Sequence, residues 1–215
     1  PGVAGDNALP NTAVAALIQH NTSGIISRKG EGMERPKGLE GKKYATWDAP
    51  IEKAMMQNVV EKDGGDFSKV ELIPSTVTDE VSALKSKSVD AIWIFYAWAG
   101  VATEVADLET DYFAFKDINP VFDYYTPVVI ANNDFLEEKP DTAKAFLRAL
   151  KQGYEDAIAD PDEAASILLE ASPELDEELV KASQEYLKDQ YKADVKQWGY
   201  IDPARWNAFY GWLNE

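Results

Sequence analysis

Two large aromatic residues, Tyr96 and Trp98, follow directly on a short apolar run in the middle of the chain. The run 91–95 has the length and composition of a buried strand, and the small residues at 99–100 can start a helix. In an α/β sheet, the end of such a strand lies at the edge where ligands bind. Stacking is the chemistry that two aromatic rings offer, so the pattern predicts a site for a planar small molecule. The alternative, that both rings belong to the core, stays open.

Groups that could perform catalysis are scarce in this sequence. His20 is the only histidine, it stands beside Asn21, and no nucleophile-elbow Gly-x-Ser-x-Gly accompanies it. The chain also lacks a Walker loop, a Gly-x-Gly-x-x-Gly and a His-Glu-x-x-His. The acidic runs 155–163 and 174–178 miss the spacing of a calcium loop. We therefore expect no catalytic residue, no metal site and no cofactor.

Strands and helices are expected to alternate through the first half of the chain. The Gly- and Lys-rich loop 28–41 separates an opening pair of strands from the rest, and Asp48 is expected to cap a helix that starts at Pro50. This alternation favours βαβ units and a mostly parallel sheet. The expected strands are 12–18, 25–26, 42–47, 70–73 and 90–96.

The second half of the chain is expected to be helical after a strand at 124–131. One helix should present Phe146, Leu150, Tyr154 and Ile158, spaced four apart, to the core. Three further helices are expected to start where an N-cap residue precedes a proline, at 160–161, 172–173 and 202–203.

Composition limits the classes of partner. The chain has 38 acidic against 21 basic residues and a net charge of −17, which disfavours nucleic acid and anionic membrane surfaces. Its longest apolar run, 91–102, is well short of the roughly 20 residues that span a bilayer. The absence of cysteine excludes disulfides and thiolate sites within these residues and suits an exported bacterial protein.

Several segments, taken in order, resemble a known family. The chain is similar to periplasmic-type substrate-binding proteins of ABC importers, in particular the branch that binds thiamine pyrimidine precursors. That branch shares its fold with yeast pyrimidine synthases and with sulfonate- and nitrate-binding proteins. The likeness extends from about Val14 to the end, and the segments that carry it are Gly38-Leu-Glu-Gly-Lys-Lys-Tyr44, Trp47-Asp-Ala-Pro50, Asp90–Trp98, Tyr124–Asn132 and Trp206–Trp212.

The resemblance implies an α/β fold of the periplasmic-binding-protein type (type II). Two α/β lobes would be joined by two crossing strands and would close on a ligand. Residues 26–126 would form the second lobe, and 1–25 with 127–215 the first. Because members normally have further residues at the start, we expect the first lobe to be incomplete at its N-terminus.

The resemblance also implies a set of ligand-binding residues. Trp47 and Asp48 would lie where a helix amino terminus offers N–H groups, while Tyr96 and Trp98 would stack on the ligand. Pyrimidine binders carry an acidic residue at position 96, so a tyrosine there leaves the exact ligand open. The expected ligand-binding residues are Asn21, Thr22, Trp47, Asp48, Tyr96, Trp98 and Tyr125.

The function expected from the resemblance is non-catalytic binding of a small aromatic heterocycle, in particular a thiamine pyrimidine precursor, and its delivery to an ABC permease. Such a protein is extracytoplasmic, either periplasmic or a lipoprotein whose lipid anchor lies outside this chain. One alternative is a sulfonate, taurine or nitrate binder, although Lys and Arg cluster at 28–43, away from the aromatics. Another is a pyrimidine synthase, whose family has a cysteine-rich motif and a reactive histidine. A third is an interaction module that uses the C-terminal aromatic helix.

Overall fold

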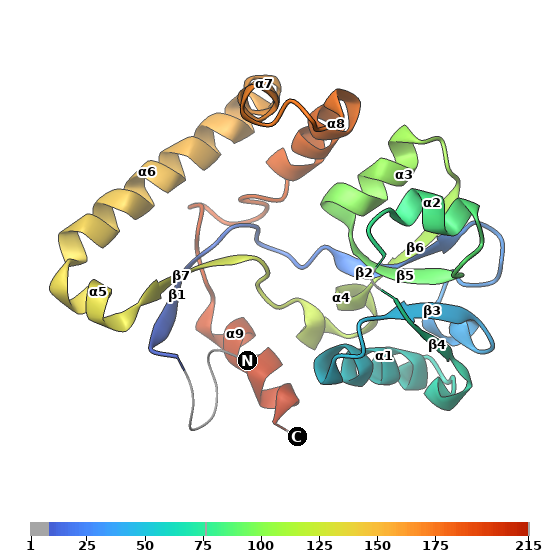
Figure 1. The fold of residues 1–215 in the computed structure, drawn as a ribbon. Helices are drawn as coiled ribbons and strands as arrows, with labels where there is room; N and C mark the ends of the chain where they lie inside the picture. Colours follow the sequence, from blue (N-terminus) through green and yellow to red (C-terminus); the bar gives the residue numbers. More distant parts are fainter. Residues whose placement is uncertain (1–8, 76, 215) are drawn as a thin grey trace. The chain divides into compact units, whose positions relative to one another are not determined.

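A computed structural model of the chain describes residues 9–75 and 77–214, which divide into two compact units (Figure 1). Unit 1 comprises the residues up to Asn21 together with Tyr124–Asn207, and unit 2 comprises Thr22–Asp123 together with the residues from Ala208 onward. The expected lobes, 26–126 and 1–25 with 127–215, remain a prediction beside these two units. Each unit is described below on its own.

The strands are β1 (Asn11–Ala16), β2 (Ser23–Arg28), β3 (Lys43–Thr46), β4 (Glu71–Pro74), β5 (Ala91–Phe95), β6 (Thr110–Ala114) and β7 (Val128–Asn132). The helices are α1 (Pro50–Lys62), α2 (Glu80–Lys85), α3 (Val101–Val105), α4 (Phe115–Ile118), α5 (Asn133–Glu138), α6 (Pro140–Ala159), α7 (Pro161–Ala171), α8 (Glu177–Lys188) and α9 (Pro203–Leu213). Among the described residues, no helix is both long enough and apolar enough to cross a bilayer.

Unit 2 is built on a five-stranded sheet with the order β4-β3-β5-β2-β6. The pairs β3–β4 and β3–β5 are parallel, but β2 runs antiparallel to both β5 and β6. The expectation of a mostly parallel sheet was therefore wrong: the sheet is mixed. Helices α2 and α3 lie over one face, and α1 and α4 lie over the other (Figure 1).

Alternation along β5 sends side chains to both faces of this sheet. Ile92 and Ile94 pack with Ile26 and Leu84 in the core beneath α2 and α3. Trp93 points to the opposite face, where its ring centroid lies 4.2 Å from that of Phe115 at the start of α4. Both faces are thus filled, which makes β5 a rigid support for the residues that follow it.

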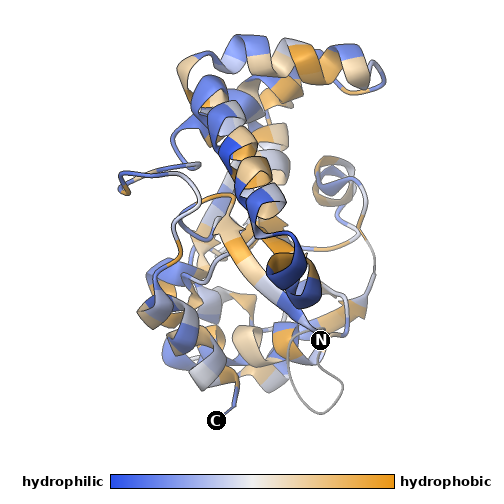
Figure 2. Cartoon of the chain, turned by 90° about the vertical axis from the view of Figure 1, so that its left-hand side faces the viewer, coloured by the Kyte–Doolittle hydropathy of each residue, from blue (hydrophilic) through white to orange (hydrophobic). Residues whose placement is uncertain are grey.

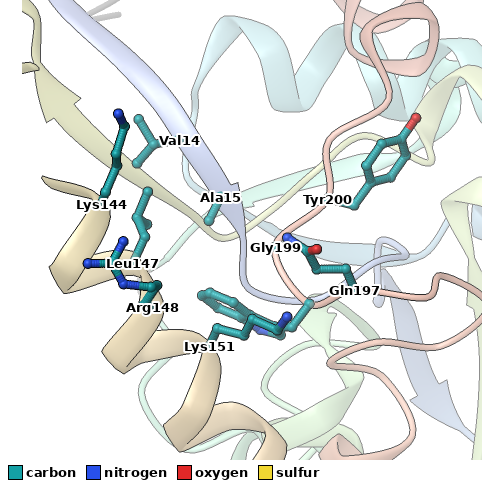
Figure 3. Close-up of a pocket in the computed structure, with 10 residues that line it drawn as sticks. Val14, Ala15, Lys144, Leu147, Arg148, Lys151, Gln197, Gly199 and Tyr200 are labelled. Atoms are coloured by element: carbon teal, nitrogen blue, oxygen red, sulfur yellow. The ribbon is translucent and has the colours of Figure 1, made fainter. Parts of the chain in front are cut away.

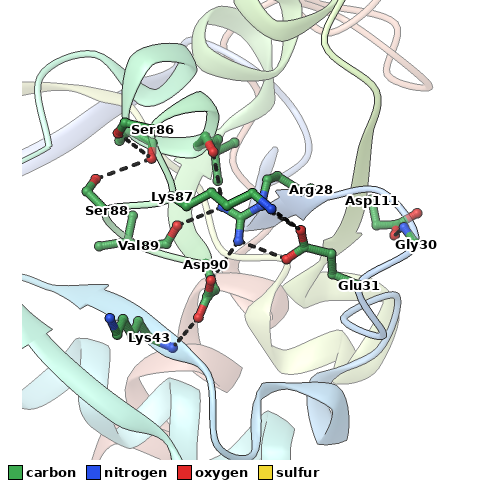
Figure 4. A network of polar contacts seen from close by, with 12 residues as sticks. Arg28, Gly30, Glu31, Lys43, Ser86, Lys87, Ser88, Val89, Asp90 and Asp111 are labelled. Atoms are coloured by element: carbon green, nitrogen blue, oxygen red, sulfur yellow. Dashed lines mark hydrogen bonds and ion pairs between the residues drawn. The ribbon is translucent and has the colours of Figure 1, made fainter.

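A buried arginine ties the strands together at the amino end of β5 (Figure 4). The Arg28 guanidinium donates to both carboxylate oxygens of Glu31, each at 2.8 Å, and to Asp90 Oδ1 at 2.6 Å. It also donates to the backbone carbonyl oxygens of Leu84 and Val89. The other Asp90 oxygen accepts from the Lys43 N–H at 2.9 Å. Because Arg28 has its donors satisfied, we assign the cluster a structural role.

Unit 1 contains a two-stranded antiparallel sheet of β1 and β7, with α6 packed against it. Hydrophilic and hydrophobic residues follow one another in bands along α6 (Figure 2). Its core face is formed by Leu147, Leu150, Tyr154 and Ile158. Phe146 is 57% exposed, so its predicted place on that face was wrong. The observed core face begins with Leu147 and Leu150, which are three residues apart. A spacing of three fits the 3.6-residue helical period as well as a spacing of four does.

Two of the three predicted capping signals start a helix. Asp160 accepts from the N–H of Glu163 at the start of α7, and Asp202 accepts from the N–H of Ala204 at the start of α9. The third predicted helix start, at Ser172, was wrong, because the next helix, α8, begins at Glu177. Its N-cap is Asp176, which accepts from the N–H of Leu179.

Candidate functional site

The predicted site residues of unit 2 gather at one edge of its sheet. Parallel strands β3 and β5 both end at this edge, so Trp47 and the segment Tyr96–Gly100 follow them there. Antiparallel β2 begins at the same edge, since Ser23 pairs with Phe95, and this places Thr22 beside it. The edge is the carboxyl end of the parallel strands, where open α/β sheets bind ligands.

Exposed aromatic side chains mark this edge. Trp47 is 51% exposed, Trp98 43% and Phe95 41%, although each is a large hydrophobic residue. The ring of Trp47 lies 5.4 Å from that of the buried Trp93, centroid to centroid. We call Trp47, Trp93, Phe95 and Trp98 the aromatic edge. Exposed apolar groups that gather in one place are typical of a binding surface.

A buried carboxylate, Glu52, holds the turn that carries Trp47. Glu52 lies in the first turn of α1, is 1% exposed, and accepts hydrogen bonds from the Tyr44 hydroxyl at 2.6 Å and the Thr46 hydroxyl at 3.2 Å. It also accepts from the backbone N–H groups of Trp47 at 3.0 Å and Ala49 at 3.4 Å. Burial, together with this carboxylate, raises the pKa of the Tyr44 hydroxyl far above its ordinary value, so Tyr44 stays a donor.

The sequence predicts Asp48 as the N-cap of α1, and this prediction was wrong. The N-cap is Ala49, and Glu52 satisfies its N–H. Asp48 instead has a left-handed backbone, with φ of 62°, and its carboxylate pairs with Lys53. Its side chain therefore remains at the surface beside Trp47, where the exposed carboxylate oxygens can accept hydrogen bonds from a ligand.

The edge also offers hydrogen-bond donors. The first N–H groups of a helix have no intrahelical acceptor, and because Pro50 has no N–H, that of Ile51 remains at the start of α1. A further donor is the indole Nε1 of Trp93, which is buried and has no partner in the described part of the chain. Leaving such a donor unpaired is costly, which makes it a candidate for contact with a ligand.

Tyr96 and Trp98, predicted together, have different surroundings. The Tyr96 hydroxyl donates to Glu104, and its ring centroid lies 4.8 Å from that of Tyr112. The five residues Tyr96–Gly100 form a π-helical turn, and a Cβ at Gly100 would come within 2.5 Å of the Tyr96 ring. Tyr96 is thus anchored against the core, whereas Trp98 remains exposed.

The two predicted site residues of unit 1 are buried. Asn21 is fully buried, and Tyr125 is 6% exposed. The Tyr125 hydroxyl accepts from the N–H of Asp202 at 2.9 Å, and the Arg205 guanidinium lies 3.9 Å from the centre of its ring. These contacts give Tyr125 a supporting place within unit 1.

His20 is engaged in the same unit. Its Nε2 lies 3.1 Å from Asp194 Oδ1, and its Nδ1 lies 3.2 Å from Arg205 Nη1. Both ring nitrogens of His20 therefore have partners within unit 1. Among the described residues, no group of three or more His, Asp or Glu side chains is placed to hold a metal ion.

Two residues of the site were missed in the sequence. Trp93 lies inside a run that reads as buried strand, and nothing local distinguishes its indole from a core side chain. Glu52 looks like an ordinary first-turn acid that favours the helix dipole. Its buried partners Tyr44 and Thr46, on the preceding strand, reveal that the carboxylate is turned inward.

Residues 3–164 match the family model described as NMT1/THI5 like. The chain is 28% identical to the formylaminopyrimidine-binding protein of Halalkalibacterium halodurans, over 96% of this chain and 63% of that protein's length. It is 22% identical to the 4-amino-5-hydroxymethyl-2-methylpyrimidine phosphate synthase THI5 of Saccharomyces cerevisiae, over 94% of this chain and 59% of that protein.

A solved structure shows the same fold. The periplasmic aliphatic sulphonate binding protein SsuA of Escherichia coli superposes with a TM-score of 0.64 and 13% identity, covering 83% of this chain and 60% of that one. The periplasmic-binding-protein-like α/β fold expected from the sequence is therefore confirmed. Since the family model covers most of its length, the chain belongs to the NMT1/THI5-like family.

Proposed function

We propose that this chain is the ligand-binding part of an ABC importer component and that it binds a thiamine pyrimidine precursor without transforming it. The observation that carries the proposal is the aromatic edge of unit 2, at which Trp47 and Trp98 are exposed on a rigid support. The similarity to a formylaminopyrimidine-binding protein favours the same ligand class. Units 1 and 2 would correspond to the two lobes of the fold.

The polar groups at the edge complement an aminopyrimidine. Its ring nitrogens and formyl oxygen accept hydrogen bonds, which the Trp93 indole and the N–H group of Ile51 can donate. Its exocyclic amine donates, and the Asp48 carboxylate can accept. The flat ring would stack on Trp47 or Trp98, a contact that adds about 1 kcal/mol beyond the buried area. This set of donors, acceptor and rings supports an aromatic heterocycle as the ligand.

The principal alternative ligand is a sulfonate or another small anion. The N–H groups at the start of α1 would suit an anion. A basic side chain near them, Lys53, is already paired with Asp48, and Asp48 would repel an anion. We therefore favour an uncharged or cationic aromatic ligand.

The enzymatic alternative is a pyrimidine synthase of the yeast type, favoured by the 22% identity to that enzyme. Catalysis by this stretch would need a reactive side chain, such as a cysteine thiol or a free histidine. The chain has no cysteine, and its one histidine is held by Asp194 and Arg205. We propose a binding protein rather than an enzyme on these grounds.

An extracytoplasmic location and an ABC permease as partner follow from this function. The protein would be either a periplasmic protein or a lipoprotein whose lipid anchor lies outside the 215 residues. The partner would be the permease that receives the pyrimidine.

The ligand can be identified directly. Full-length protein purified without refolding should release an aminopyrimidine when denatured, as detected by mass spectrometry. The Trp98→Ala variant, prepared in parallel, should release much less, while Phe146→Ala, which removes an exposed aromatic from unit 1, should release as much as the wild type. Release of a sulfonate instead, or equal release from all three proteins, would contradict the proposal.

A further inference from the structure

Unit 1 has a pocket of about 420 Å³ that the proposed pyrimidine site does not use (Figure 3). Its walls come from three places: the end of β1, one face of α6, and the segment 197–200. All of these elements belong to unit 1, so the pocket exists within a single compact unit. It shares no residue with the aromatic edge.

The segment 197–200 is fixed against β1, so this wall of the pocket is already in place before a ligand binds. The Trp198 indole donates to the carbonyl oxygen of Leu17 at 3.1 Å and stacks on Tyr154, with ring centroids 4.4 Å apart. The N–H of Ala16 donates to the carbonyl oxygen of Gly199 at 3.2 Å. Gly199 has φ of 86°, and a Cβ there would lie 3.2 Å from the Cβ of Ala15. A ligand would therefore meet a wall that needs little reordering.

Three cations line the α6 wall of this pocket: Lys144, Arg148 and Lys151. They are spaced at i, i+4 and i+7, so they share one face of the helix. In the described part of the chain, none of the three has an acidic partner. By contrast, lysines on and just after α8 in the same unit, at positions 181, 188 and 192, each pair with a glutamate.

The three cations lie together although the protein is strongly acidic. With a net charge of −17, acidic partners are plentiful, yet three like charges are left together on one helix face, where they repel one another. An anion in the pocket would relieve that repulsion and gain charge-assisted hydrogen bonds. Beside the cations, Val14, Leu147 and Trp198 give the pocket an apolar wall.

We propose that this pocket binds a small amphipathic anion. The ligand would have one aromatic ring or a short aliphatic chain against Val14, Leu147 and Trp198. Its carboxylate, sulfonate or phosphate head would lie at Lys144, Arg148 and Lys151. This inference does not depend on the pyrimidine-binding function, because the two sites have no residue in common.

Calorimetric titration of the full-length protein tests the inference with simple probes. Benzoate, benzenesulfonate and phenyl phosphate supply the three head groups on one ring, while benzyl alcohol lacks the charge and inorganic sulfate lacks the ring. We expect at least one aromatic anion to bind at least about tenfold more tightly than benzyl alcohol and than sulfate, and the preferred head group identifies the anion class. Failure of all three anions to bind, or equal affinity for sulfate, would overturn the proposal.

Paired variants locate the binding. R148Q with K151Q should weaken it at least about tenfold, whereas K181Q with K188Q, which makes the same change of charge on α8, should leave it unchanged. All four side chains are at least partly exposed, so both variants should melt near the wild-type temperature. Equal weakening in both pairs, or a loss of binding in Trp98→Ala, would place the anion elsewhere and overturn the assignment.

Discussion

Trp98 and Tyr96 are two residues apart, but they should respond to mutation in opposite ways. Trp98 is 43% exposed, so Trp98→Ala should change the melting temperature little. It should weaken pyrimidine binding at least about tenfold, which corresponds to about 1.4 kcal/mol, because a stacking surface is lost. Tyr96 packs on the core beneath α2 and α3, so Tyr96→Ala should lower the stability by about 3 kcal/mol.

Thermal melting and ligand titration of both variants separate these effects. Phe115→Ala is a useful reference, because Phe115 is fully buried and its truncation should cost about 3–5 kcal/mol. If Trp98→Ala melts as early as Phe115→Ala, then Trp98 is a core residue and the aromatic edge is not a binding surface.

Glu52 should control the shape of the site without contacting the ligand. Glu52→Ala would leave the buried hydroxyls of Tyr44 and Thr46 without their acceptor, at a cost of about 1–3 kcal/mol for each unsatisfied group. The Trp47 turn should then loosen, which a rise in acrylamide quenching of tryptophan emission would report. Glu61→Ala, at the other end of α1, serves as the control. Unchanged stability and quenching in Glu52→Ala would show that the carboxylate does not hold the turn.

A site residue that stands next to the end of a strand can be recognised in the sequence, whereas one that lies inside a strand or helix cannot. Trp98 could be predicted because it follows a strand, whereas Trp47 was implied by the resemblance to the binding-protein family. Trp93 could not, since a strand alternates its side chains and the sequence does not say which face is near a ligand. Asp48 was assigned as the cap because its type suits one, but it has a left-handed backbone and the N-cap is the next residue, while the helix starts at Pro50 as expected.

At the scale of elements, the Arg28 cluster should make the stability of the sheet depend on pH. The Arg28 guanidinium holds the pKa of Glu31 below its ordinary value. Burial acts to raise the pKa of Asp90, but hydrogen bonds from the Lys43 N–H and from Arg28 outweigh it and hold that pKa low. Carboxylates with lowered pKa values stabilise the fold above their unfolded pKa, near 4, and that contribution is lost as the pH falls through the folded pKa.

Denaturant unfolding at a series of pH values tests this contribution. The wild type should lose stability steeply below about pH 4, and Asp90→Asn should be less stable at pH 7 with a shallower loss on acidification. Lys29, whose partner Glu109 is exposed, provides a surface pair for comparison, and Lys29→Gln should change little. If the stability of Asp90→Asn falls with pH as steeply as that of the wild type, the Arg28 cluster is not the source of the pH dependence.

Element positions could be predicted more reliably than strand directions. The strands at 43–46 and 91–95 lie within the expected ranges, and the strand at 71–74 overlaps the expected 70–73, because each is a short apolar run bounded by polar or turn-forming residues. The antiparallel course of β2 was missed, since a local pattern does not carry direction. The helix expected at 173 was wrong because capping residues also form turns, and the chain turns there before Asp176 starts α8.

At the scale of the whole molecule, the family's fold leads us to expect that units 1 and 2 change their arrangement when ligand binds. Small-angle scattering of the full-length protein should show a smaller radius of gyration after addition of a pyrimidine ligand. Trp98→Ala at the same ligand concentration provides the control and should remain closer to the free state. An unchanged radius at saturating ligand would show that binding does not close the protein.

We propose above all that the aromatic edge of unit 2 binds an aminopyrimidine. The most direct measurement is a calorimetric titration of the full-length protein with formylated and hydroxymethyl aminopyrimidines, taurine and nitrate, repeated with Trp98→Ala. We expect at least one pyrimidine to bind, at least about tenfold more weakly in the variant, and taurine and nitrate not to bind. Tight binding of taurine or nitrate, with no response to any pyrimidine, would contradict this proposal.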